Sequence, residues 1–290
     1  MKKIILFCCL FAVSFAYAQK KEVDTNGVID KLQFIVYYHY QIHSKDKVGK
    51  TVCDTCDLVL EVGKKISKFD KKNIFLADSI TENKPNITQE EKEQLLEQSM
   101  QAESYNMPVV YQNYPSGKMT IRDSQSPHYY VYQEKIRQLK WNLSDESTSI
   151  CGYDCKKATT TYGGRTWTVW YTEDIPTTFG PWKLNGLPGL ILQAEDADHQ
   201  LSFTMYGLVK SNIPIKYKVR ASDIKTTRDK FISFKNSIIT NPKYVTNPLY
   251  YIAPESLKAV TVFKRGGVIV INDGSPISMI GHVAVPLELK

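Results

Sequence analysis

Two histidines and two cysteines near the N-terminus have the types and spacing of metal ligands. His39 and His43 stand four positions apart, and Cys53 and Cys56 stand three positions apart. Imidazole and thiolate groups at such spacings can hold zinc or copper. However, the flanking segments have the composition of strands, and the first residues look like an export signal, which sends thiols to an oxidising compartment. We therefore keep a metal-binding periplasmic protein as an alternative, and we expect no metal and no cofactor.

The common catalytic sequence patterns are missing from this chain. It has no nucleophile elbow, no paired metalloprotease histidines, no phosphate-binding loop and no dinucleotide-binding glycines. Acidic pairs such as Glu173-Asp174 fall where turns are expected, so they are more simply explained as solvated loop charges. Catalytic groups can also be brought together by folding alone, and a hydrolase with a spatially assembled site therefore remains a second alternative. The leading interpretation is a protein that binds rather than catalyses.

Four cysteines remain after the predicted signal: Cys53, Cys56, Cys151 and Cys155. An even number in an exported chain predicts disulfides. Four cysteines allow three pairings, and the sequence does not choose among them. Pairing each cysteine with its near neighbour would close very small loops and would stabilise the fold little, so pairing across the chain is slightly favoured.

The segment between two predicted strands, residues 173–189, is dense in proline, glycine and aromatic residues. Proline fixes φ and removes an N–H donor, whereas glycine permits backbone conformations closed to other residues. Such a segment fits a rigid apolar groove for a hydrophobic ligand or a partner strand. It fits better a long loop that packs over the core and has a purely structural role. On the first interpretation the binding residues are Trp170, Tyr171, Ile175, Pro176, Trp182, Leu187, Pro188 and Gly189.

The N-terminus predicts a cleaved secretory signal at residues 1–18. Two lysines precede an apolar run at positions 4–15, and Ala16-Tyr17-Ala18 is a small-x-small cleavage site. The run is too short to span a bilayer, and no later stretch of about 20 apolar residues follows it. Loss of the two lysines lowers the net charge from +7 to +5. The charges are dispersed, so we expect no binding of nucleic acid.

Short segments rich in β-branched and aromatic residues dominate the rest of the chain, which predicts a mainly β protein. Two or three peripheral helices are expected, at Gln89–Glu103 after a Thr88/Glu91 capping box, at Ser222–Ile239 and at Pro254–Ala259. No linker divides the chain, so residues 19–290 should form a single domain with 254–290 as a surface extension. Lys65–Phe69 should be a short strand or a turn. The predicted strands are Gln33–His43, Asp57–Val62, Val109–Tyr114, Lys118–Arg122, His128–Tyr132, Lys135–Leu143, Ile150–Tyr162, Arg165–Thr172, Leu190–Glu195, Gln200–Val209, Ile213–Arg220 and Val268–Asn272.

Several blocks of this sequence resemble the GLPGLI family of secreted bacterial proteins. They are residues 57–69, the YQNYPSG stretch at 111–117, residues 150–158 and the hexapeptide GLPGLI at 186–191. The resemblance implies an exported protein of a Gram-negative envelope, periplasmic or associated with the outer membrane. It transfers no catalytic or binding residue.

The order of β segments is also similar to that of periplasmic lipoprotein carriers, which implies a curved, half-barrel-like antiparallel sheet with helices as a lid. From the residues and the resemblance together we expect an envelope protein that binds a hydrophobic small molecule or lipid, or an outer-membrane protein. A fold likeness of this kind does not fix a function.

Overall fold

The computed structural model describes residues 27–45, 49–83, 87–91, 94, 107–125, 128–240, 246–247, 250–251, 260–264, 267–271 and 287–288. The predicted signal peptide, most of the predicted helix at Gln89–Glu103, the predicted helix at Pro254–Ala259 and most of the C-terminal extension lie outside these residues. The capping box that should start the first of those helices is present. The Glu91 amide donates to Thr88 Oγ1 at 3.1 Å, and the Thr88 amide donates to a Glu91 carboxylate oxygen at 3.0 Å.

In the described part of the chain, thirteen strands form one large sheet. They are β1 (Val28–Lys45), β2 (Thr51–Gly63), β3 (Ser67–Lys71), β4 (Val109–Gln112), β5 (Lys118–Gln125), β6 (His128–Lys135), β7 (Asn142–Ile150), β8 (Tyr153–Tyr162), β9 (Arg165–Thr172), β10 (Leu190–Asp196), β11 (Leu201–Lys210), β12 (Pro214–Lys216) and β13 (Ile224–Lys225). The order across the sheet is β13-β6-β5-β4-β3-β2-β1-β11-β10-β9-β8-β7, and β12 pairs with β1. Neighbours are antiparallel except β13 and β6. The predicted mainly β, curved antiparallel fold is confirmed.

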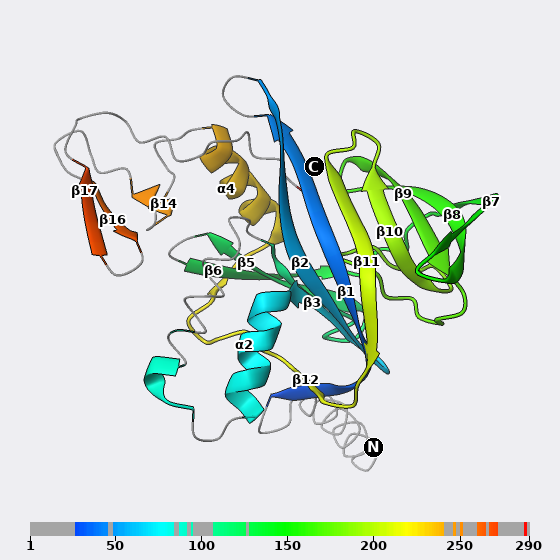
Figure 1. Cartoon of the computed structure of the whole chain (residues 1–290), viewed down its shortest axis with the longest axis horizontal. Helices are drawn as coiled ribbons and strands as arrows, with labels where there is room; N and C mark the ends of the chain where they lie inside the picture. Colours follow the sequence, from blue (N-terminus) through cyan, green and yellow to red (C-terminus); the bar gives the residue numbers. More distant parts are fainter. Residues whose placement is uncertain are drawn as a thin grey trace, which may run out of the picture.

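The remaining elements are the helices α2 (Lys72–Asn83) and α4 (Arg228–Thr240) and two small hairpins, β14 (Thr246–Asn247) with β15 (Tyr250–Tyr251) and β16 (Val260–Lys264) with β17 (Gly267–Ile271). Figure 1 shows long, nearly parallel ribbons of β1, β2 and β11 at the centre. The strands β7 to β10 curl away on one side, and α2, α4, β5 and β6 lie on the other.

Alternation along β1 explains how the sheet acquires two different faces. Tyr38, Tyr40 and Ile42 are fully buried, whereas His39 and Gln41 between them are exposed. Successive side chains of a strand point to opposite faces, so the first set defines an inner face and the second an outer face. The inner face carries the main core, which gathers apolar side chains from the strands β1 to β6 and β8 to β11.

Helix α2 was missed in the sequence because it begins one residue after β3 ends and has only a weak apolar stripe. Its Phe75 is buried with Ile35, Val59 and Ile215 in a smaller cluster on the outer face. The helix therefore covers part of a face that would otherwise be open to solvent.

Helix α4 starts later than the predicted Ser222. The pair Ile224–Lys225 joins β6 as the short parallel strand β13, so the chain is still extended there. Thr227 then caps the helix, since its carbonyl accepts from the Phe231 amide at 3.0 Å and its hydroxyl from the Lys230 amide at 3.4 Å.

Three predicted strands differ from the observed ones. The segment 136–141 lies outside any strand, between β6 and β7, although Lys135–Leu143 was predicted as one strand. Cys151 and Gly152 form a turn with φ of 51° and 81°, which separates β7 from β8 within the predicted Ile150–Tyr162. Only residues 214–216 of the predicted Ile213–Arg220 pair as a strand. The predicted two-glycine hairpin is confirmed, because Gly163 and Gly164 both have positive φ between paired β8 and β9.

Candidate functional site

Residues 173–189, here called the GLPG loop, connect β9 to β10 and fold back on themselves. The Gly186 amide donates to the Thr178 carbonyl at 2.8 Å, and the Leu190 amide donates to the Ile175 carbonyl at 3.0 Å. A Cβ atom at Gly189 would overlap the carbonyl of Thr172, so only glycine fits there. Close backbone packing thus explains Gly189, whereas Gly186 of the same hexapeptide has a positive φ of 92°.

A buried glutamine fixes the middle of this loop to the sheet. The side-chain amide of Gln112, at the end of β4, donates to the carbonyls of Gly180 and Trp182 at 3.1 and 3.0 Å. Trp182 itself has a left-handed φ of 54° and is only 1% exposed. Its ring contacts those of Tyr162 and Trp167, at centroid distances of 5.4 and 5.9 Å. The loop is therefore part of the core.

The predicted binding residues do not form one surface. Of the eight, Tyr171, Trp182, Leu187 and Gly189 are buried, Trp170 and Ile175 are half-buried, and Pro176 and Pro188 are exposed. This burial matches the structural interpretation of the loop. Binding at these residues stays a prediction, and Pro176 is the member that lines a cavity.

The first cavity has a volume of about 550 Å³ and lies where the GLPG loop meets the ends of β2 and β4. Several of its polar side chains are already used to hold the backbone: Gln112 as above, Asn113 to the Lys65 carbonyl at 2.7 Å, and Asn185 to the Lys183 carbonyl at 2.9 Å. Its lining residues are Gln33, Gly63, Lys64, Lys65, Gln112, Asn113, Ile136, Pro176, Thr177, Thr178, Phe179, Asn185 and Gly186.

Other groups of the first cavity are available to a ligand. The side chains of Gln33, Lys65 and Thr178 are exposed and make no hydrogen bond or ion pair to the described residues. Phe179 and Ile136 supply apolar surface beside them. The cavity thus combines a rigid, internally bonded floor with a rim of uncommitted donors and acceptors.

The second cavity has a volume of about 620 Å³ and lies between the segment 136–141 and the turn of the β8–β9 hairpin. Ile136 lines the first cavity and Arg137 lines the second, so this segment separates them. The lining residues of the second cavity are Arg137, Gln138, Leu139, Lys140, Asn142, Thr160, Thr161, Tyr162, Gly163, Gly164 and Arg228.

A buried ionic network, here called the Lys183 network, joins the GLPG loop to β6, α4 and the C-terminal segment. Lys183, only 1% exposed, pairs with Glu134 at 2.8 Å and with Glu288, and Glu288 also pairs with Arg228. Burial opposes the charge of each group, but the partners outweigh it. The pKa of Lys183 is consequently raised and that of Glu288 lowered from their ordinary values. Two positive and two negative side chains balance, which suits a structural role.

The outer face carries a second constellation, here called the Tyr206 cluster. Asp57 accepts from His39 Nδ1 at 2.7 Å, from Tyr206 at 2.9 Å and from Lys72 at 3.1 Å, and Lys72 also donates to the Tyr206 hydroxyl at 2.8 Å. The rings of His39 and Tyr206 stack at 4.0 Å. Burial raises the pKa of Asp57, but the three hydrogen bonds outweigh it and leave it below its ordinary value.

A β-bulge brings Tyr206 to this place. Tyr37 pairs with Gly207 and Tyr38 with Met205, so Tyr206 is the extra residue and its side chain is re-aimed over His39. The arrangement could transfer a proton through His39. However, its residues line neither of the two cavities described above.

The cysteine predictions need correction. None of Cys53, Cys56, Cys151 and Cys155 forms a disulfide in the structure. Cys53 lies opposite His43 on the outer face and is exposed, whereas Cys56 lies opposite Tyr40 on the inner face and is 5% exposed. A spacing of three on a strand puts two side chains on opposite faces, which explains why neither a local disulfide nor the His-Cys metal site is assembled. No group of three or more metal-ligating residues occurs in the part of the chain that the structure describes.

Comparisons with known proteins find a family match in the middle of the chain. Residues 80–204 match the family described as N-glycanase peptide, N-terminal domain. No match was found among curated protein sequences. Within the described residues, no helix has the length and apolar character needed to cross a membrane.

Three solved structures are similar in part. The structure of PNGF-II is 13% identical with a TM-score of 0.49, and covers 81% of this chain, which itself spans 35% of that protein. A DUF1329 family protein from Desulfovibrio piger is 11% identical with a TM-score of 0.19, covering 62% of this chain and 86% of that one. An outer membrane lipoprotein-sorting protein domain from Vibrio parahaemolyticus is 9% identical with a TM-score of 0.21, covering 68% and 91%. Such TM-scores carry no argument about ligands or activity.

Proposed function

We propose that this chain is a non-enzymatic binding protein of the cell envelope that holds an oligosaccharide in the first cavity. The observation that carries the proposal is the mixed lining, in which Phe179 stands beside the uncommitted polar groups of Gln33, Thr178 and Lys65. A sugar ring presents C–H groups on its faces and hydroxyls at its edges. It therefore binds well where an aromatic surface lies beside hydrogen-bond donors and acceptors.

The rigidity of the cavity favours sugars, whose individual contacts with a protein are weak. The loop wall is fixed by Gln112 and by the closely packed Gly189, and the opposite wall by the hydrogen bond from Asn113 to the Lys65 carbonyl. A wall that is ordered before binding loses little conformational entropy when the ligand arrives. A hydroxyl-rich ligand gains little net energy on binding, because it exchanges hydrogen bonds with water for hydrogen bonds with protein. A small entropy loss in the protein is therefore important for its affinity.

The family match supports the same ligand class. Residues 80–204 contain the GLPG loop, Gln112, Asn113 and the segment 136–141, and thus most of the lining of both cavities. The name N-glycanase in the matched description makes N-linked glycans the first ligands to try.

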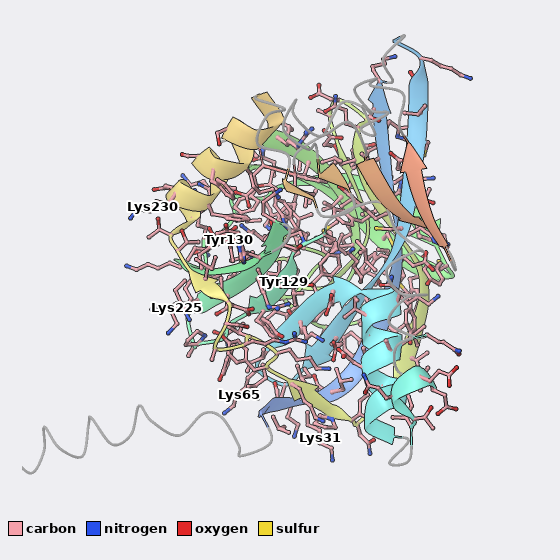
Figure 2. All side chains as sticks on the ribbon, turned by 90° about the vertical axis from the view of Figure 1, so that its left-hand side faces the viewer. Lys31, Lys65, Tyr129, Tyr130, Lys225 and Lys230 are labelled. Atoms are coloured by element: carbon pink, nitrogen blue, oxygen red, sulfur yellow. The ribbon has the colours of Figure 1, made fainter. Side chains whose placement is uncertain are left out.

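Isothermal titration calorimetry with a purified high-mannose N-glycan tests this proposal. We expect binding by the wild type and a Kd at least about tenfold higher, equivalent to about 1.4 kcal/mol, in the double variant Gln33→Ala/Lys65→Ala. Lys31→Ala is the matched control, because Lys31 projects from the same side of the molecule as Lys65 but lines neither cavity (Figure 2). Equal binding by the double variant and the control would show that the first cavity is not the site.

A second candidate function is attachment to an outer-membrane protein or lipid through the surface formed by β6, β13 and α4. Tyr129, Ile224 and Phe234 are 44%, 40% and 36% exposed there. Lys225 and Lys230 project outward from the same region (Figure 2). Apolar side chains ringed by lysines suit an anionic lipid surface or an acidic partner.

Sedimentation with vesicles tests this second candidate. The wild type should sediment with phosphatidylglycerol vesicles and the variant Tyr129→Ser/Phe234→Ser should not. Equal sedimentation of both proteins would exclude this surface as the attachment site.

The sequence also predicted a hydrophobic small molecule or lipid as ligand, which would bind inside the fold. The inner face is filled by the chain's own side chains, including Trp182 and Leu187, so such a ligand would have to displace part of the GLPG loop. Native mass spectrometry of protein purified from the periplasm gives the answer. An extra mass that is lost on denaturation would support a resident ligand, and a bare native mass would count against it.

A further inference from the structure

The second cavity differs from the first in charge. Arg137, Lys140 and Arg228 line it, and none of the described lining residues is Asp or Glu. Arg228 is neutralised by Glu288 and Glu134 in the Lys183 network. Arg137 and Lys140 are exposed and have no carboxylate partner among the described residues. The cavity therefore keeps about two uncompensated positive charges.

A buried tyrosine supplies a second, independent sign of a ligand. Tyr162 is 9% exposed and lines the cavity, with its ring held against Trp182. Its hydroxyl makes no hydrogen bond to the described residues and is not sealed from solvent. Burial raises the pKa of this hydroxyl, so it stays a donor throughout the physiological range. A hydrogen-bond donor without a partner among these residues, at the wall of a positively charged cavity, is well placed to donate to an anionic oxygen of a ligand.

The backbone holds these groups in fixed positions. The hydroxyl of Thr160 donates to the Lys140 carbonyl at 2.9 Å, which ties the segment 136–141 to β8. The indole of Trp141 donates to the Asn185 carbonyl at 2.9 Å, which ties the same segment to the GLPG loop. The two cavities thus share one rigid partition, and consecutive residues of it, Ile136 and Arg137, face different cavities.

We propose that the second cavity binds the carboxylate of an acidic sugar residue, and that one acidic oligosaccharide spans both cavities across the segment 136–141. The planar guanidinium of Arg137 can grip a carboxylate with two hydrogen bonds. Tyr162 donates to the same carboxylate or to a neighbouring hydroxyl, and Lys140 adds charge from the rim. This inference rests on the proposed oligosaccharide function and names its ligand as an acidic glycan.

The test compares one glycan with and without its acid. A sialylated biantennary N-glycan and its desialylated form are titrated into the full-length mature protein by calorimetry. We expect the wild type to bind the sialylated form about tenfold more tightly. Arg137→Gln should abolish that preference, so that the sialylated and desialylated forms bind with similar Kd values. Tyr162→Phe should reduce the preference while keeping the ring contact with Trp182, and thermal unfolding checks that both variants fold.

Lys230→Gln is the control for general charge, since it removes one exposed lysine outside both cavities. A preference that persists in Arg137→Gln, or that falls equally in Lys230→Gln, would overturn the inference. Inorganic phosphate that competes as well as free glucuronate would also overturn it, because the cavity would then be a general anion site. The proposed function fails separately if the wild type binds neither glycan. In that case the second cavity is tested with glucuronate alone by NMR titration. Chemical-shift changes that occur in the wild type but not in Arg137→Gln would show that the cavity binds a carboxylate.

Discussion

The GLPG loop and the segment 136–141 lie side by side and share a hydrogen bond, yet they use their residues in opposite ways. In the loop, Trp182, Lys183 and Leu184 are each at most 1% exposed, and Gly189 is required by its close approach to the Thr172 carbonyl. In the segment, Arg137, Gln138 and Lys140 are exposed and line a cavity. Gly189 of the hexapeptide therefore serves packing, whereas the cations of the second cavity that lack an ion-pair partner among the described residues lie in a segment without any motif.

Substitution of Gly189 should produce the largest loss of stability, because it disrupts the close packing of the GLPG loop. In Gly189→Ala the added methyl group would overlap the carbonyl of Thr172, and backbone cannot move aside as a flexible side chain can. We expect a loss of more than about 4 kcal/mol of unfolding free energy, measured by urea denaturation. Gly207→Ala is the control, since a Cβ there meets only Tyr37 at an ordinary 3.5 Å. Similar stability of the two variants would mean that the loop is loosely packed.

The Lys183 network should give the next largest effect and a distinct pH dependence. The lowered pKa of Glu288 means that its contribution is present above the ordinary glutamate pKa and is lost as pH falls through the lower folded value. The raised pKa of Lys183 means that its contribution is present below the ordinary lysine pKa and is lost as pH rises through the higher folded value. The pair therefore stabilises the fold between about pH 4 and about pH 10.

Glu288→Gln tests this dependence. It leaves Lys183 buried with less compensation, so we expect a loss of about 2–3 kcal/mol at pH 7 and a flatter decline of stability below pH 4. Glu195→Gln, which removes only the exposed partner of His199, should change neither. Thermal unfolding across pH 3–8 measures both variants. A parallel shift of the Glu288→Gln curve at every pH would contradict the ionic explanation.

Much of the fold could be read from the sequence because its strands carry local signals. The alternation in β1 and β9 and the two glycines between β8 and β9 each specify an element without reference to the rest of the chain. Helix α2 could not be read in this way, since its burial depends on Ile35 and Val59 of distant strands. The segment 136–141 has a strand-like composition, but its hydrogen bonds go to Thr160, to the GLPG loop and to the carbonyl of Gly117, which lies before β5, instead of to a paired strand.

The candidate sites were harder to predict than the fold, for a physical reason. Cavity lining depends on which chain segments meet, and Gln33, Lys65 and Thr178 become neighbours only through the sheet order. The Tyr206 cluster depends on a one-residue bulge, and a shift of one residue in a strand changes which face a side chain occupies. The faces of Cys53 and Cys56 were not predicted either, because the predicted strand began at Asp57, whereas β2 begins at Thr51 and includes both cysteines.

Trp141 is the contact between the two regions, so its substitution should have an intermediate effect. Trp141→Phe keeps an aromatic ring but removes the indole donor to the Asn185 carbonyl. We expect a loss of about 1 kcal/mol, as for a single hydrogen bond, measured by urea denaturation. The amide exchange of the segment 136–141 should speed up while that of the GLPG loop stays slow. Equal acceleration in both regions would show that they open as one unit.

The smallest effect on stability should come from the segment's own charged side chains. Arg137→Gln/Lys140→Gln removes two exposed cations that have no ion-pair partner among the described residues, so we expect a change within about 0.5 kcal/mol in urea denaturation. A slight gain in stability is expected, because both cations line the same cavity, and none of its described lining residues is a carboxylate. If removal of these side chains leaves the unfolding free energy unchanged, stability does not account for their presence at the wall of a rigid cavity. If the double variant instead loses as much stability as Glu288→Gln, the side chains of the segment have a structural role like those of the loop. The proposal that they serve a ligand in the second cavity then fails.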